Sequence, residues 1–275
     1  MPLVVLSLTG TMERKGRDHM TAPDPVAFTL FGADIRWYGI LIASGFILAI
    51  IISYMRAPKQ GIESERVLDL ALWIIPFSII GARAYYVIFE WDMYRDNPFT
   101  VLAIRNGGLA IHGGILVGLL TGWLVCRHYK VPFLRMADLI FPEVALAQAI
   151  GRWGNFFNSE AHGGPTDLPW GILVDGQKVH PTFLYESIWC FFLFWFLIWM
   201  AKRKRFDGQI AFLYGMLYSV ERGLVEQLRT DSLMIGPFKQ AQVLSFFAFA
   251  GCLILYVWFS RRAKQRPAGE GKEKA

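Results

Sequence analysis

Charged residues are scarce in this chain. Asp, Glu, Lys and Arg make up 18% of its 275 residues, whereas hydrophobic side chains reach 54%. Soluble domains average about 25% charged and about 45–50% apolar residues. A water-soluble fold could not bury this much apolar surface, which includes 22 Phe, 10 Trp and 10 Tyr. The composition therefore predicts an all-α, polytopic integral membrane protein.

Cysteines and clusters of metal-binding residues are also few. Cys126, Cys190 and Cys252 each lie alone within or at the end of an apolar run. No Cys-x-x-Cys pair and no His/Cys/Asp cluster has the spacing of a metal site, so we interpret the cysteines as packing residues and expect no metal or other cofactor. The net charge of +6 comes from short basic clusters between apolar runs. This pattern is typical of membrane topology and not of a nucleic-acid-binding surface.

Seven apolar runs approach the ~20 residues that a membrane helix requires. They cover residues 37–56, 68–90, 109–127, 133–152, 182–201, 209–228 and 241–260, of which the fourth and sixth are the least hydrophobic. We divide the chain into an extracytoplasmic leader at 1–36, a seven-helix membrane domain at 37–260, which we expect to carry the functional site, and a charged, disordered cytoplasmic tail at 261–275. The sequence has no internal repeat.

The loops between these runs predict the orientation. Basic residues concentrate after the first, third, fifth and seventh runs, most densely at 202–205, which read KRKR. Because such loops stay in the cytoplasm, the N-terminus is expected outside and the C-terminus inside. Arg14, Lys15 and Arg17 in the leader favour the opposite orientation, and the four consistent internal loops outweigh them.

On this topology, polar residues from six of the helices gather near the outer face. They are Tyr38, Arg83, His112, Arg152, Asn155, Glu186, Arg222, Glu226 and Arg229. Tyr218, Arg222, Glu226 and Arg229 follow one another at intervals of four, four and three residues, which places them on one face of a helix. An arginine within a bilayer costs about 2.5–3.5 kcal/mol, so such groups usually face a polar cavity. Singly, each arginine could reach lipid headgroups and His112 could pack a helix. Together they predict one site that opens toward the outer leaflet.

Two other patterns concern helix packing. Gly114, Gly118 and Gly122 recur at intervals of four and form a smooth stripe that admits a neighbouring backbone. Glu143 and Gln148 lie in the middle of the fourth run, where we expect them to bond to other helices.

Several motifs resemble those of one family, the bacterial prolipoprotein diacylglyceryl transferases. The most specific is GRWGNFFNSEAHG at 151–163. The others are WYGI at 37–40, GARAYYVIF at 81–89, GGLAIHGGILVG at 107–118, HPTFLYE at 180–186 and the Arg-x3-Glu-x2-Arg spacing at 222–229. They occur in the family's order across most of the chain, and together they are specific where any one alone is weak.

The resemblance implies a reaction in the bacterial plasma (inner) membrane. An enzyme of this kind transfers the diacylglyceryl group of phosphatidylglycerol to the lipobox cysteine thiol of a prolipoprotein signal peptide, forms a thioether and releases glycerol phosphate. This is the first step of lipoprotein maturation. The implied partners are the lipid, the prolipoprotein and the bilayer, without nucleic acid, and the active site of this multi-pass protein faces the outer side.

The resemblance also suggests site residues. A thiol of pKa ~8.5 must become a thiolate, for which His112 is the natural base by residue type. Arg152 and Arg222 suit the phosphodiester because a guanidinium binds phosphate bidentately. The supporting residues are Arg83, Arg229, Tyr38, Asn155, Asn158, Glu160, Gly163 and Glu226. Glu160 and Glu226 are expected to position the arginines, although either could be the base instead, and the sequence leaves this choice open.

Two other classes of membrane protein remain as alternatives. A transporter would place polar residues along the full depth of the membrane and often has repeated halves, whereas the inner halves here are almost entirely apolar. An intramembrane protease would need a GxSG serine motif or paired membrane aspartates, which the sequence lacks.

Overall fold

The computed structural model describes Thr21, residues 23–104 and residues 107–265. Most of the predicted leader (residues 1–20 and 22) and the last ten residues of the predicted tail (266–275) lie outside the described residues. The predicted disorder of the tail is wrong for its first five residues, because 261–265 continue the last helix.

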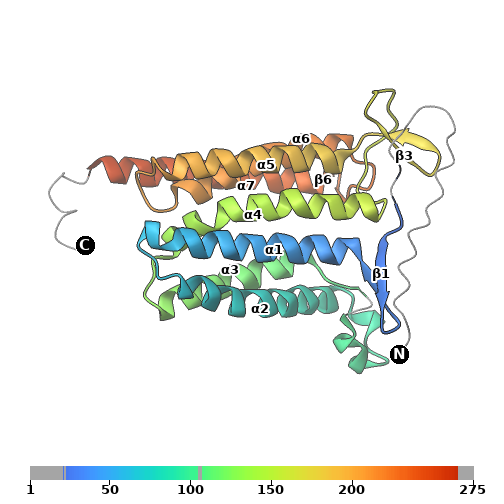
Figure 1. The fold of residues 1–275 in the computed structure, drawn as a ribbon, viewed down its shortest axis with the longest axis horizontal. Coiled ribbons are helices and arrows are strands. Elements are labelled where there is room, and N and C mark those ends of the chain that lie inside the picture. The colour runs from blue at the N-terminus through green and yellow to red at the C-terminus, as the bar shows by residue number, and fades with distance from the viewer. Residues whose placement is uncertain (1–20, 22, 105–106, 266–275) are drawn as a thin grey trace, which may run out of the picture.

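Long helices dominate the described residues and run side by side along the long axis of the molecule (Figure 1). They are α1 (Trp37–Arg56), α2 (Glu65–Phe89), α3 (Ile111–His128), α4 (Phe133–Phe157), α5 (Thr182–Ala201), α6 (Gln209–Leu228) and α7 (Gln240–Gln265). Their bounds follow the predicted runs closely, except that α4 and α7 each continue five residues past their predicted ends at 152 and 260. Arg152 and Asn155 therefore lie within the last turns of α4 and share a helix face.

The surface of the bundle is strongly apolar. Phe46 and Ile47 on α1 and Phe246 and Phe247 on α7 are all exposed. Among the described residues, α1 with the short helix η1 (Ala57–Gln60), α2, α5 and α7 are long and apolar enough to cross a membrane by length and composition. Helices that are apolar on all sides are stable in lipid and not in water. The chain is thus a mostly helical, multi-pass membrane protein.

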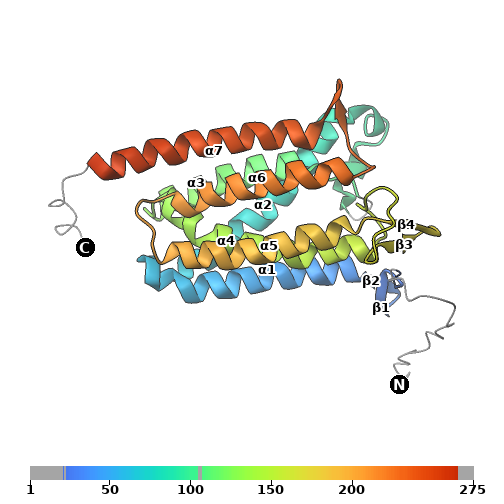
Figure 2. The same cartoon turned by 90° about the horizontal axis from the view of Figure 1, so that it is seen from above.

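Close helix contacts define how the bundle is assembled. The helix α1 packs against α4, α2 against α3, α4 against α5, and α6 against α7, the last pair forming one side of the molecule in Figure 2. The predicted glycine stripe of α3 faces α2: a Cβ at Gly118 would lie 2.6 Å from Ser78 Oγ, and one at Gly114 would lie 3.3 Å from the Ser78 carbonyl oxygen. The expectation that these glycines admit a neighbouring backbone is confirmed.

Three short antiparallel hairpins lie at one end of the bundle (Figures 1 and 2). They pair β1 (Val26–Leu30) with β2 (Ala33–Arg36), β3 (Ile172–Val174) with β4 (Gln177–Val179), and β5 (Met234–Ile235) with β6 (Phe238–Lys239). The 3-10 helices η2 (Trp91–Met93) and η3 (Pro98–Leu102) connect α2 to the segment before α3. The part of the predicted leader that the structure describes thus contains a hairpin, and α1, α3, α5 and α7 all begin at this end.

Charged residues also join the helices near the opposite end. Glu143 of α4 is fully buried and forms an ion pair with Arg56 of α1, which confirms the expectation of an interhelical bond. Asp138 accepts hydrogen bonds from the backbone amides of Gly208, Ile210 and Ala211 at 2.7, 2.8 and 3.0 Å. This carboxylate of α4 therefore caps the N-terminus of α6, where amides without helical partners and the helix dipole favour a negative charge.

Candidate active site

A single buried carboxylate joins the two arginines that the sequence singles out. Glu186 of α5 is fully buried, and its Oε2 lies 3.1 Å from Nη1 of Arg152 on α4. Its other oxygen, Oε1, accepts a hydrogen bond of 3.0 Å from Nη1 of Arg222 on α6. Arg222 also pairs through Nη2 with Oε2 of Glu226, at 2.7 Å. Three helices thus contribute to one cluster of alternating charges.

The guanidinium groups retain access to a ligand. The side chains of Arg152 and Arg222 are 18% and 20% exposed, whereas Glu186 and Glu226 are 0% and 2% exposed. The carboxylates therefore lie behind the arginines. An anion that bound to this cluster would therefore meet the partly exposed arginine side chains and not the carboxylates.

Tyrosine and glutamine side chains extend the cluster along α6 and α4. Arg152 donates a hydrogen bond of 3.2 Å from Nη2 to the Tyr218 hydroxyl, and the ring of Tyr218 stacks on that of Tyr214 at 5.7 Å between centroids. The Tyr214 hydroxyl donates to Oε1 of Gln148 at 2.9 Å. Gln148, which we expected to bond across helices, does so.

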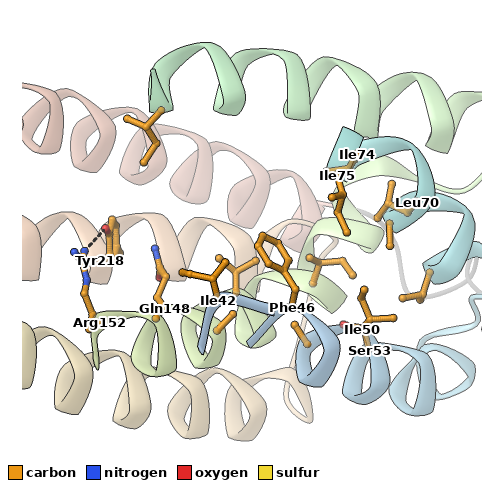
Figure 3. A pocket seen from close by; sticks show the side chains of 18 of the residues that line it. Ile42, Phe46, Ile50, Ser53, Leu70, Ile74, Ile75, Gln148, Arg152 and Tyr218 are labelled. Carbon is orange, nitrogen blue, oxygen red and sulfur yellow. Dashed lines mark hydrogen bonds between the residues drawn. The ribbon is translucent and has the colours of Figure 1, made fainter. Parts of the chain in front are cut away.

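An apolar cavity of about 410 Å³ ends at this cluster. Figure 3 shows Arg152 and Tyr218 at one end and Ser53, Ile50 and Leu70 toward the other. Its walls come chiefly from α1, α2 and α4, and its polar lining includes Tyr38, Gln148, Arg152, Asn155 and Tyr218. An apolar cavity that ends at the guanidinium of Arg152 suits an amphiphile with an acyl chain and an anionic headgroup.

Tyr38 and Asn155 lie on the same cavity as Arg152, as the sequence predicts for residues of one site. The close approach of α1 to α4 depends on Gly154, since a Cβ there would lie only 2.5 Å from Cδ2 of the Tyr38 ring. The motif around Arg152 thus combines polar groups with the small residue that lets Tyr38 lie beside them.

The loop after α4 carries three of the predicted residues. Asn158 donates from Nδ2 to Oε1 of Glu160 at 3.2 Å, and Glu160 is exposed. Ser159 and Ala161 adopt positive φ values of 52° and 56°, which are uncommon for residues other than glycine. Glu160 forms no ion pair with an arginine among the described residues, so the expectation that it positions an arginine lacks a direct contact.

Gly163 joins this loop to the ends of two helices. Its amide donates to the His180 carbonyl at 2.9 Å, and the Gly164 amide donates to the Leu228 carbonyl at 2.9 Å. A Cβ at Gly163 would lie 2.7 Å from the His180 Cβ and 3.0 Å from the Leu228 carbonyl oxygen. Only glycine fits between the start of α5 and the end of α6. Close packing therefore explains why residue 163 is a glycine.

Arg229 follows α6 and binds a carboxylate that the sequence did not draw attention to. Its Nε and Nη2 donate to the two oxygens of Asp231 at 2.9 and 2.6 Å. These hydrogen bonds lower the pKa of Asp231 from its ordinary value. Arg229 also forms a β-bridge with Gly163. The backbone of Arg229 thus contacts the loop after α4, whereas its guanidinium binds Asp231 two residues further along the chain.

Arg83 does not direct its guanidinium into the cluster of Glu186. The side chain is buried and donates four hydrogen bonds to backbone carbonyls, those of Thr100, Val101, Gly107 and Gly108, at 2.7 to 2.9 Å. It also lies over the Tyr94 ring, 5.1 Å from its centroid. With four of its five donors used, Arg83 holds the segment before α3 and has little capacity to bind a phosphate.

His112 lies in the first turn of α3, as predicted. It is partly buried, and its ring centroid is 6.2 Å from that of Tyr85 on α2. The adjacent Ile111 lines the cavity, so the N-terminus of α3 borders the same space as Arg152. His112 itself is not among the described residues that line this cavity.

Sequence reasoning missed two carboxyl groups in the bundle. From the sequence, Glu186 is identified only as one of the polar residues near the outer face, with no role assigned to it. Its position within a membrane helix could have indicated the role, because a carboxylate there normally has a charged partner. Glu221 precedes Arg222 and is 2% exposed, and neither of its oxygens has a hydrogen-bond partner among the described residues.

The structure is thus that of a helical membrane protein with a charged cluster beside an apolar cavity, and comparison with known proteins adds its family. The family model described as prolipoprotein diacylglyceryl transferase matches residues 25–258. A phosphatidylglycerol–prolipoprotein diacylglyceryl transferase of Clostridioides difficile is 51% identical over 90% of this chain and 100% of its own length. The enzymes of the same name from Finegoldia magna and Clostridium novyi are 48% and 46% identical, over 87% and 84% of this chain and 97% and 95% of their own lengths. The chain belongs to the prolipoprotein diacylglyceryl transferase family.

Proposed function

We propose that this chain transfers the diacylglyceryl group of phosphatidylglycerol to the thiol of a lipobox cysteine in prolipoproteins, as the first step of lipoprotein maturation. The observation that carries the proposal is a pair of partly exposed arginines that share the buried Glu186, of which Arg152 lines the end of an apolar cavity. Membership of the family and the names of its relatives agree with it.

We infer the arrangement in the membrane from the lengths of the helices and from the basic residues in the loops between them. All seven cross the bacterial plasma membrane, with the N-terminus outside and the C-terminus in the cytoplasm. A helix of 20 residues is about 30 Å long, which matches the hydrocarbon thickness of a bilayer. The less apolar α4 and α6 supply Arg152 and Arg222 from the interior of the bundle. The hairpins and the cluster then lie toward the outer side, where the substrates bind.

The lipid would bind in two parts. One acyl chain occupies the cavity between α1, α2 and α4, and the phosphodiester reaches Arg152 and Arg222. A planar guanidinium can donate two parallel hydrogen bonds to phosphate, and it stays charged at every physiological pH. Tyr38 and Asn155 line the same space and would orient the oxygens of the glycerol.

The chemistry needs a thiolate and a stabilised leaving group. The substrate's cysteine loses its proton to a base, its sulfur attacks the glycerol carbon, and the C–O bond to phosphate breaks. Glycerol phosphate leaves with the bonding electrons, and the arginines stabilise the negative charge that develops on it. His112 is the base that we favour by residue type, and Glu226 and Glu160 are the alternatives.

The remaining predicted residues have supporting roles in this proposal. Gly163 and Arg229 hold the loop after α4 against α5 and α6, and Asn158 and Glu160 shape that loop. Arg83 supports the site indirectly, because it fixes the segment that leads into His112.

A direct assay tests the function. Purified protein is incubated with phosphatidylglycerol and a lipobox peptide, and the thioether product is measured by mass. We expect product from the wild type and severe losses with Arg152→Ala and with Arg222→Ala. Absence of product from folded wild-type protein would reject the function, and full activity of both variants would reject the role of the arginines. An unchanged rate and pH profile in His112→Gln would exclude this residue as the base.

A further inference from the structure

The end of α6 nearest the hairpins is held by a lysine from another segment. Lys239, the last residue of β6, directs its ammonium at the final turn of α6. Its Nζ donates to the carbonyl oxygens of Glu226 at 2.7 Å, Arg229 at 2.8 Å and Gln227 at 3.4 Å. The three donors of one ammonium group thus meet three carbonyls from four consecutive residues.

Two of these carbonyls, those of Glu226 and Gln227, belong to the last turn of α6, and the third belongs to Arg229, which directly follows the helix. The Arg229 amide also donates to the Glu226 carbonyl, at 3.3 Å. The last four C=O groups of a helix accept no hydrogen bond within it, and the helix dipole places partial negative charge there. Many helices end on a glycine that turns the chain, but α6 ends at Arg229 in an extended conformation. Lys239 therefore supplies the positive charge and the donors that this terminus requires.

A second side chain from the same segment strengthens the contact. Gln242, in the first turn of α7, donates from Nε2 to the Gly223 carbonyl at 3.1 Å. The helices α6 and α7 lie side by side in Figure 2, so the start of α7 contacts α6 over its last two turns. Asp138 caps the other end of the same helix. Oppositely charged side chains from other segments thus hold both ends of α6.

The position of α6 affects the charged cluster because this helix supplies two of its four residues, Arg222 and Glu226. Glu226 connects the two sets of contacts, since its carboxylate pairs with Arg222 and its carbonyl accepts from Lys239. Arg222 lies one turn earlier and must reach Glu186 of α5 at 3.0 Å. Loss of the bond to the Glu226 carbonyl would free the turn that sets this distance.

We propose that Lys239 is a positioning residue for the transfer reaction, which holds the last turn of α6 so that Arg222 meets Glu186 and the lipid phosphate. This inference rests on the proposed function. Lys239 does not bind the phosphate itself, because all three of its donors are directed at backbone carbonyls. Its effect therefore reaches the lipid only through the backbone of α6.

The test compares three substitutions in the transfer assay. Lys239→Met keeps the length of the side chain and removes the charge, and we expect kcat to fall about tenfold with a smaller change in KM for phosphatidylglycerol, since small displacements of catalytic groups are costly. Lys239→Arg keeps donors for the carbonyls and should recover most of the lost rate. Lys264→Met removes a lysine from the exposed far end of α7 and serves as the matched control.

Amide hydrogen exchange of residues 226–233 supplies a second measurement that does not depend on activity. We expect faster exchange in Lys239→Met and near wild-type exchange in Lys239→Arg. Faster exchange with an unchanged kcat would overturn the positioning role, and so would a loss of rate that the arginine variant does not recover. If folded wild-type protein forms no thioether, the proposed function fails, and this outcome is distinct from either result for Lys239.

Discussion

Replacement of Glu186 by Gln perturbs the cluster at its centre. The substitution preserves the size of the side chain and removes the charge that pairs with both arginines, at 3.1 and 3.0 Å. Removing one partner of a buried ion pair typically costs about 3–5 kcal/mol. The glutamine oxygen can still accept one of the two hydrogen bonds, so we expect a loss of stability near the lower limit of that range.

The effect on activity should be larger than the effect on the amount of folded protein. Removing one preorganised electrostatic group from an active site usually costs about 10²–10³-fold in rate. We therefore expect kcat/KM to fall about 100-fold, which corresponds to ~2.7 kcal/mol of lost transition-state stabilisation. The assay is the initial rate of thioether formation by monodisperse protein, normalised to its concentration.

A matched control separates this effect from a general loss of charge. Glu63 is 69% exposed and pairs with Arg66 at 2.7 Å on the surface. Because an exposed pair contributes about 0–1 kcal/mol, Glu63→Gln should leave both the rate and the melting temperature nearly unchanged. Wild-type kcat/KM in Glu186→Gln would refute the idea that this carboxylate positions the arginines. A loss equal to that of the control would refute it as well.

Three other predictions follow from the surrounding contacts. Gly163→Ala should lower the melting temperature by an amount equivalent to about 1–3 kcal/mol, because its Cβ overlaps neighbouring atoms, whereas Gly164→Ala, with no atom nearer than 3.8 Å, should not. Arg83→Met should expose the segment 98–108 to proteolysis, because four hydrogen bonds to its carbonyls are lost; an unchanged cleavage pattern would contradict this role. The pKa of Asp231 is lowered by Arg229, so the pair stabilises the fold above the unfolded pKa of ~3.9, and this contribution is lost as the pH falls through the lowered pKa. The difference in melting temperature between wild type and Asp231→Asn should therefore be present at neutral pH, be small because Asp231 is half exposed, and vanish in strong acid.

Hydropathy alone predicted the helices. In lipid, the backbone N–H and C=O groups of an apolar run find no water, so they must form hydrogen bonds with one another, which a helix provides. The polar stripe of α6 was also predictable, since the spacing of Arg222 and Glu226 places them on one helix face, and they pair at 2.7 Å. The end of α4 was placed too early because GRWGN resembles a loop in composition, although it continues the helix to Phe157.

The contacts that the sequence could not predict are those between distant segments. Glu186 reaches arginines that lie 34 residues before it and 36 residues after it, and no local spacing indicates this. Arg83 binds main-chain carbonyls, which every residue possesses, so a pattern of side chains cannot reveal that partner. Asp138 caps a helix that begins 71 residues later. Residue types indicated where charge gathers, and the packing of helices determined which charges meet.

Photo-crosslinking of the lipid tests most directly whether the cavity and the arginines form a single site. A phosphatidylglycerol with a photoreactive group at the end of one acyl chain is bound to the protein, irradiated, and the labelled peptides are identified by mass. We predict labels on α1 and α2 near Ser53 and Leu70, at the apolar end of the cavity, which are displaced by unlabelled phosphatidylglycerol and strongly reduced in Arg222→Ala. Labels spread over the lipid-facing surfaces of α5 and α7, equal in the wild type and in this variant, would contradict the account.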